Sequence, residues 1–142
     1  MEVSHVRNRL RQAIEVSRDR GQKRRQQISD AERAYASFIE DTATPVMRML
    51  ANALKVEGYT FTLFTPGGGV RLASDRGRDD YIELALDGAL VPPQVVARIS
   101  RTRGSRTLDE ERPVKAGAAP DSITEDELLA FLLDALEPWL ER

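Results

Sequence analysis

The chain has 142 residues and a formal net charge of −2, with 41% apolar, 31% charged and only 6% aromatic residues. This length leaves room for one modest core and excludes a second domain of enzyme size. Because there is no cysteine, disulfides, thiolate catalysis and zinc sites with sulfur ligands are excluded as well. The first residues lack a secretory signal, and no apolar run approaches the roughly 20 residues that span a bilayer, so we expect a cytoplasmic protein without membrane contact.

The first predicted element is a long amphipathic helix from about Glu2 to Asp41. At about 100° per residue, its apolar side chains form one stripe within an arc of about 120°. The stripe keeps its phase across Gly21, which favours one continuous helix, although a glycine inside a helix costs roughly 1 kcal/mol. The alternative is a break at Gly21 and a restart near Ser29, whose spacing to Glu32 fits a capping box. The stripe consists of Val3, Val6, Leu10, Ala13, Ile14, Ile28, Ala31, Tyr35, Phe38 and Ile39.

A second, shorter helix is predicted from Pro45 to Glu57. Thr44 is a residue type that favours the N-cap, and Pro45 suits the first helical position, where its missing N–H is not needed. Gly58 would end the helix at the C′ position, with Tyr59 making the apolar contact of a Schellman cap. The predicted buried face consists of Val46, Met49, Leu50, Ala53 and Leu54.

After the second helix the apolar pattern changes to a period of two, which indicates β-strands. The turn Pro66 to Gly69 would join the first two strands in a hairpin. The predicted strands are Tyr59 to Phe64, a run from Val70, Tyr81 to Leu86, Gln94 to Arg103, and a short fifth strand near Thr107 to Val114. The short connections make this four- to five-stranded meander antiparallel.

The last predicted element is a helix packed on the sheet. Thr124 fits an N-cap with Glu127 as its capping-box partner, and Ile123 and Leu128 fit a hydrophobic staple. Pro138 is expected to kink or end the helix near Ala135 to Glu137. Its broad apolar face consists of Leu128, Leu129, Leu132, Leu133, Leu136 and Leu140. The expected fold class is α+β, with an extended amphipathic helix for oligomerisation at residues 1–43 and a compact domain at residues 44–142.

No pattern of residues indicates catalysis, a cofactor or a metal site. His5, the only histidine, lies in the first turn of a helix, where a rigid catalytic base is not expected. The acidic groups at Asp79-Asp80, Asp109 to Glu111 and Glu125 to Glu127 have the composition of a turn, a solvated loop and a helix N-terminus. The glycines after Pro66 lack the following helix of a phosphate loop, so we interpret them as a hairpin turn. We therefore expect no enzyme activity, no cofactor and no metal.

Arginines gather in two parts of the chain. Arg7, Arg11, Arg18 and Arg25 form a row beside the apolar stripe, within about 40° of one another. A second group lies in the fourth predicted strand and in the segment after it, and consists of Arg98, Arg101, Arg103, Arg106, Arg112 and Lys115. Residues 1–30 hold eight basic and four acidic residues, whereas residues 121–142 hold one and seven. Nucleic acid would suit these arginines, but the overall acidity and the lack of a nucleic-acid-binding motif favour a solvated flank or pairing with the acidic C-terminal helix.

The length of the first helix leads to the functional hypothesis. Forty helical residues span about 60 Å, whereas the rest of the chain forms a domain about 30 to 35 Å across. Part of the stripe therefore has no partner in its own chain, and we expect it to pack on a second copy or on another protein. Small residues in its middle would allow a crossing helix to approach closely. The predicted interface consists of Val3, Val6, Leu10, Ile14, Ser17, Gly21, Ile28, Tyr35, Phe38 and Ile39.

The sequence thus predicts a non-enzymatic interaction protein that homodimerises through a coiled coil of its first helix and binds a protein partner as an adaptor, regulator or chaperone. In size, acidity and helix-flanked antiparallel sheet it resembles the small dimeric chaperones of bacterial secretion systems. The first alternative is a nucleic-acid-associated accessory protein that uses Arg7, Arg11, Arg18, Arg25, Arg98, Arg101 and Arg103. The second is a ligand-binding or enzymatic domain with a pocket between the sheet and the C-terminal helix.

Overall fold

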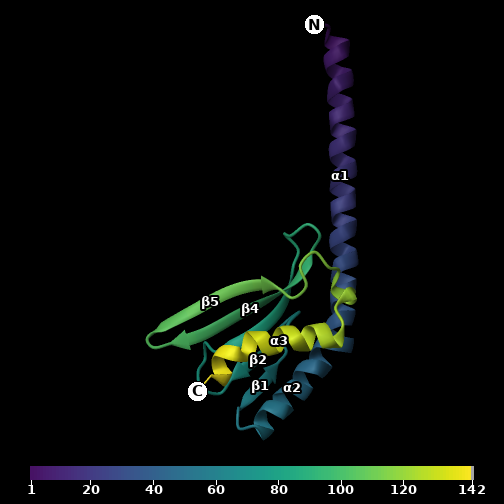
Figure 1. The fold of residues 1–142 in the computed structure, drawn as a ribbon. Helices are drawn as coiled ribbons and strands as arrows, with labels where there is room; N and C mark the ends of the chain where they lie inside the picture. The colour runs from purple at the N-terminus through teal and green to yellow at the C-terminus, as the bar shows by residue number, and fades with distance from the viewer. Residues whose placement is uncertain (142) are drawn as a thin grey trace.

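The computed structural model describes residues 1–141, and its first feature is a helical rod from Val3 to Val56. Helix α1 (Val3–Phe38) passes through one π-helical turn (Ile39–Ala43) into helix α2 (Thr44–Val56). Figure 1 shows α1 rising far beyond the rest of the molecule, while α2 bends away from its axis at the base. The predicted long helix is confirmed.

Helix α1 is continuous through Gly21. All residues of α1 on both sides of this glycine are α-helical, so the alternative of a break with a restart near Ser29 is wrong.

Within residues 1–141, no helix combines the length and the apolar character that crossing a bilayer requires.

The junction between α1 and α2 differs from the prediction at Thr44. Thr44 has helical backbone angles (φ −62°, ψ −47°), and its N–H donates to the carbonyl of Ile39, five residues back. Thr44 is therefore not an N-cap, because the chain never leaves the helix before Pro45. The wide π turn accommodates Pro45, which has no N–H to donate and whose ring would crowd the carbonyl of the preceding turn in a regular α-helix. The Thr-Pro pair marks a bend in a continuing helix.

Helix α2 ends as the sequence predicted. The Tyr59 N–H donates to the Leu54 carbonyl (2.8 Å) and the Gly58 N–H to the Lys55 carbonyl (3.1 Å), which are the two bonds of a Schellman cap. Gly58 has a φ of +90°, a conformation that costs glycine little. The predicted buried face was partly wrong, because Met47 is buried whereas Met49 and Ala53 are exposed. Since α2 packs against both the sheet and the C-terminal helix, its buried side is turned toward the space between them.

The five strands form one antiparallel sheet in the order in which they occur along the chain. They are β1 (Phe61–Phe64), β2 (Val70–Ser74), β3 (Tyr81–Asp87), β4 (Gln94–Arg103) and β5 (Arg106–Pro113). The meander is confirmed, including its fifth strand. Ile82 lies opposite Leu72 on β2 and Ile99 on β4, so these apolar side chains share one face of the sheet.

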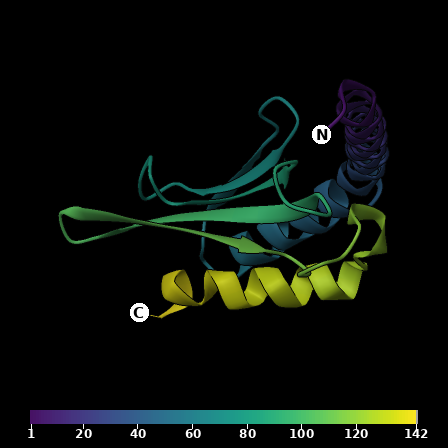
Figure 2. The same cartoon turned by 90° about the horizontal axis from the view of Figure 1, so that it is seen from above.

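The core lies between this apolar face and the helices. Figure 2 shows α2 and the C-terminal helix α3 (Glu125–Leu140) on one side of the sheet, while the other side is open. The base of α1 closes one end of the layer through Tyr35 and Phe38. The largest fully buried side chains include Met47, Leu72, Ile82, Leu84, Leu128, Leu132 and Leu136. The molecule is a two-layer α+β domain from which one end of α1 projects.

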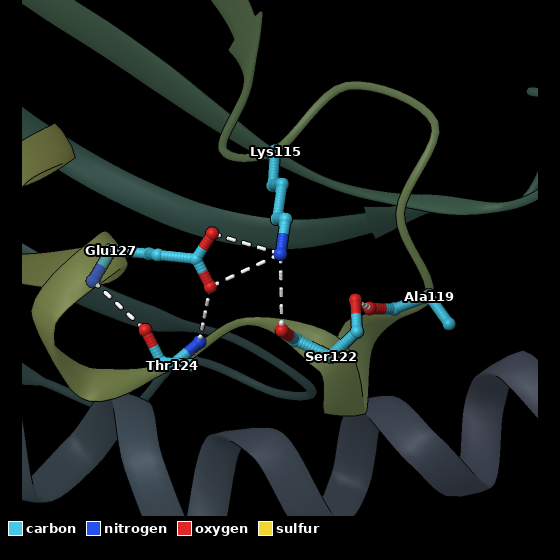
Figure 3. A network of polar contacts seen from close by, with 5 residues as sticks. All are labelled: Lys115, Ala119, Ser122, Thr124 and Glu127. Carbon is cyan, nitrogen blue, oxygen red and sulfur yellow. Dashed lines mark hydrogen bonds and ion pairs between the residues drawn. The ribbon is translucent and has the colours of Figure 1, made fainter.

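The start of α3 is fixed by the predicted capping box. The Glu127 N–H donates to Thr124 Oγ1 (3.1 Å), and the Thr124 N–H donates to Glu127 Oε1 (3.0 Å). Figure 3 shows how Lys115 joins this box, with its Nζ at 2.8 Å from Glu127 Oε2 and 3.4 Å from the Ser122 carbonyl. The ammonium of Lys115 and then the Thr124 N–H lower the pKa of Glu127 to about 2. The carboxylate therefore stays ionised at pH values where a free glutamate would be protonated.

The other end of α3 differs from the prediction at Pro138. The helix does not end near Ala135 to Glu137, because it continues through Pro138 to Leu140. Proline removes one hydrogen bond of the helix. This loss is tolerated because Pro138 lies in the last turn of α3. Trp139 follows directly, and its ring and that of Phe61 of β1 pack edge to face at a centroid distance of 6.1 Å. This contact holds the last turn of the helix on the sheet.

Candidate functional site

Residues 3–27 of α1, which we call the arm, form a long exposed surface. Every residue of the arm except Gly21 is exposed. The apolar stripe is therefore on the surface, with Val3 exposed by 74%, Leu10 by 58% and Ile14 by 40%. In both Figure 1 and Figure 2 the N-terminus lies away from the domain. At 1.5 Å per residue the arm is about 38 Å long. In this part of the chain the predicted stripe has no intrachain partner.

The lower part of the predicted stripe packs inside the domain instead. Tyr35 and Phe38 are only 8% and 2% exposed, and Ile39 packs against the same core. Ile28 is half-buried where the helix enters the domain. The predicted interface therefore divides into an upper group on the arm and a lower group that the chain itself covers. The upper group is Val3, Val6, Leu10, Ile14, Ser17 and the half-buried Gly21. Periodicity predicted the stripe but not where the domain ends.

The predicted arginine row follows the stripe along the arm. Arg7, Arg11, Arg18 and Arg25 are all exposed, and none of them belongs to an ion pair within residues 1–141. Residues 1–25 hold eight basic and three acidic residues. The arm therefore combines an apolar stripe with a strongly basic flank.

The second group of arginines does not extend this basic surface. Arg101 and Arg103 lie near the tip of the β4–β5 hairpin, which Figures 1 and 2 show projecting away from the arm. Arg98 lies in the middle of β4, with Glu83 and Glu111 opposite it on the neighbouring strands. The two groups are thus separate, and Arg98 has acidic neighbours on both sides.

The outer face of α3 is a second exposed apolar surface, which we did not predict from the sequence. Leu129, Leu133 and Leu140 are 37%, 47% and 36% exposed, because they point away from the sheet that Leu128 and Leu132 cover. All six leucines were expected to cover the sheet. The signal was the width of the apolar face, which exceeds what one sheet can bury on one helix.

Acidic residues flank this leucine stripe. Asp126, Glu137 and Glu141 are exposed and take part in none of the ion pairs within residues 1–141. Two other acids of the helix are already paired within the chain. Glu127 binds Lys115, and Asp134 binds Arg112 at 3.1 Å, where the guanidinium also lies 5.3 Å above the ring of Phe131. The outer face of α3 thus has the opposite charge to the arm.

The space between the sheet and α3, where a pocket was one of the predicted alternatives, is filled by buried leucines. A hollow of about 720 Å³ lies instead at the β1–β2 edge and is lined by Phe64, Arg71, Arg78 and the turns next to them. Arg71 in its wall is engaged by neighbours. Its guanidinium lies 4.0 Å above the ring of Tyr81, and its Nε donates to Glu83 Oε1 at 3.2 Å. The hollow is open and offers no convergent set of reactive groups.

Two buried polar groups have structural partners. The Tyr35 hydroxyl donates to the carbonyl of Gly68 at 2.6 Å and lies 3.3 Å from that of Leu84, and burial, followed by the charge of Glu83, raises its pKa to about 12. Asp80 Oδ1 accepts from the Thr102 N–H (2.9 Å) and from Trp139 Nε1 (3.2 Å), which joins β4 to the end of α3. Among the described residues 1–141, no group of three or more His, Cys, Asp or Glu could hold a metal ion.

Comparison with protein family models, with curated proteins and with solved structures found no match to this chain.

Proposed function

We propose that this protein is a non-enzymatic interaction module that assembles as a homodimer through the arm of α1, and that the assembled form binds a protein partner. The exposed apolar stripe of Val3, Leu10 and Ile14 is the observation behind this proposal. A stripe of this length left in water would favour aggregation, and covering it with a second chain removes that liability. The filled core and the absence of a metal-binding group in residues 1–141 favour binding over catalysis.

Sedimentation equilibrium over the micromolar range tests this proposal. We expect a dimer, and we expect Leu10→Glu combined with Ile14→Glu to weaken it by about tenfold or more, because each carboxylate would be buried without a partner. The matched control is Asn8→Glu combined with Gln12→Glu, which adds the same charge on the opposite side of the arm at about 100° per residue. A wild-type mass equal to the monomer throughout the range, or equal loss in both variants, would contradict the proposal.

A nucleic-acid-associated function is the second candidate, favoured by the exposed arginine row of the arm. It requires binding to oligonucleotides that weakens steeply with salt, since each phosphate contact releases counterions. Fluorescence anisotropy with single- and double-stranded oligonucleotides at low salt tests it, with Arg11→Gln combined with Arg18→Gln as the variant. Absence of binding under these conditions would exclude this candidate.

A further inference from the structure

We infer that the arm packs against the outer face of α3 on a second copy of the chain, so that two equivalent arm–α3 contacts join the two copies. This inference rests on the proposed homodimer and specifies which surfaces meet. The supporting observation is a pair of exposed apolar stripes of similar length, one flanked by basic residues and the other by acidic residues.

The two stripes have compatible dimensions. On the arm, Val3 to Ser17 spans 15 residues, or about 22 Å, and on α3, Leu129 to Leu140 spans 12 residues, or about 18 Å. Leu129, Leu133 and Leu140 lie within about 40° of one another around the helix at 100° per residue. Each stripe is therefore a narrow seam of the kind that packs along a single partner helix.

The charges match in one orientation. When the angle around each helix is counted at about 100° per residue, Arg7, Arg11 and Arg18 lie at larger angles than the apolar stripe of the arm. On α3 the acids Glu137 and Glu141 also lie at larger angles than the leucine stripe, which is the corresponding side. When two helices face each other antiparallel, corresponding sides meet. An antiparallel contact therefore places the arginine row against the acidic row of α3.

In this arrangement the N-terminal half of the arm lies beside the C-terminal half of α3. Arg7 and Arg11 then come near Glu137 and Glu141, which belong to no ion pair within residues 1–141. The small Ser17 lies toward the other end of α3, near Leu129. A parallel contact would place the arginine row on the side away from the acids.

Pairing of one arm with another arm is less favourable. In an antiparallel pair the arginine rows of the two arms meet, and in a parallel pair the two copies of Arg24, which lies on the stripe itself at about 100° per residue, face each other. Like charges in these positions destabilise helix pairs. The arm also cannot reach α3 of its own chain, because α1 is a straight rod that leaves the domain in another direction (Figure 1).

Charge reversal on each surface tests the inference by sedimentation of the full chain. Variant one is Arg7→Glu with Arg11→Glu, and variant two is Glu137→Lys with Glu141→Lys, which places cations at a helix C-terminus where they are tolerated. We expect each variant alone to dimerise about tenfold or more weakly than the wild type, because both of its contacts then join like charges. We expect the equimolar mixture to form heterodimers of near wild-type affinity, because both contacts are then complementary.

The matched control for variant one is Arg9→Glu with Arg20→Glu, which makes the same charge change on the other side of the arm and leaves heterodimer formation with variant two weak. Recovery in the mixture also shows that both variants are folded. If variant two dimerises like the wild type while Leu10→Glu with Ile14→Glu does not dimerise, the arm is an interface but α3 is not its partner, and this inference is overturned alone. A monomeric wild type overturns the inference together with the proposed function.

Discussion

The Tyr35 hydroxyl shows how one side chain can join three elements. It comes from α1, donates to the carbonyl of Gly68 in the β1–β2 turn and lies near the carbonyl of Leu84 on β3. Gly69 beside it passes so close to the Leu84 carbonyl that an added Cβ would lie 2.8 Å from that oxygen. A glycine at position 69 is thus required for close packing between backbones, which the hairpin interpretation of the sequence did not specify.

Replacing this tyrosine tests that role. We expect Tyr35→Phe to lower the free energy of unfolding by about 1 to 2 kcal/mol, because the part-buried hydrogen bond to the Gly68 carbonyl and the buried one to the Leu84 carbonyl are lost. The pKa of Tyr35 is raised from 10.0 to about 12 in the folded chain, so its contribution is complete below pH 10 and is lost as the pH rises through 12. Urea denaturation at pH 7 and pH 11 should therefore give a smaller difference between wild type and variant at the higher pH. An equal difference at both would contradict this explanation.

Among the elements, those with local signals were predicted from sequence and those that depend on packing were not. The Schellman cap at Gly58 and the capping box of Thr124 and Glu127 were predicted because they involve neighbouring residues. Thr44-Pro45 was misassigned because the π turn that accommodates proline has no sequence signal distinct from a helix start.

The surfaces divide in the same way between predicted and missed features. The stripe of α1 was visible as a periodicity, but periodicity does not say that Tyr35 is covered and Leu10 is not. The outer leucines of α3 were missed because an apolar residue on a helix is normally assigned to the core. Deciding which face is covered requires the positions of the other elements.

The helix α1 itself offers a test at Gly21. We expect Gly21→Ala to raise helicity by favouring the arm's helical state by about 1 kcal/mol, because alanine is the better helix former. The nearest atom to the added Cβ would be the mobile end of the Arg25 side chain at 3.4 Å, so no rigid group opposes it. Circular dichroism at low protein concentration should show more helix and an unchanged unfolding midpoint of the domain. A lowered midpoint would mean that Gly21 packs against the domain.

For the whole molecule, the arm and the domain should differ in protection from hydrogen exchange. Residues 3–27 have few tertiary contacts, whereas Ala31 to Leu54 include much of the core. In dilute solution, arm amides should exchange orders of magnitude faster than those of α2, because local opening of the arm disrupts no packing. Raising the concentration should slow exchange in the arm and in the outer turns of α3 together. Protection that does not change with concentration would argue against a self-assembling arm.

The continuity of α1 also restricts how this protein can change in length. Because the arm and the core-facing turns share one uninterrupted helix, inserting a single residue near Gly21 would rotate the whole upper stripe by about 100° relative to the domain. Inserting seven residues, about two turns, would keep the stripe in phase and only move it outward by about 10 Å. Homologous chains should therefore differ in arm length by near-whole numbers of turns, whereas the turns between strands can vary without this restriction.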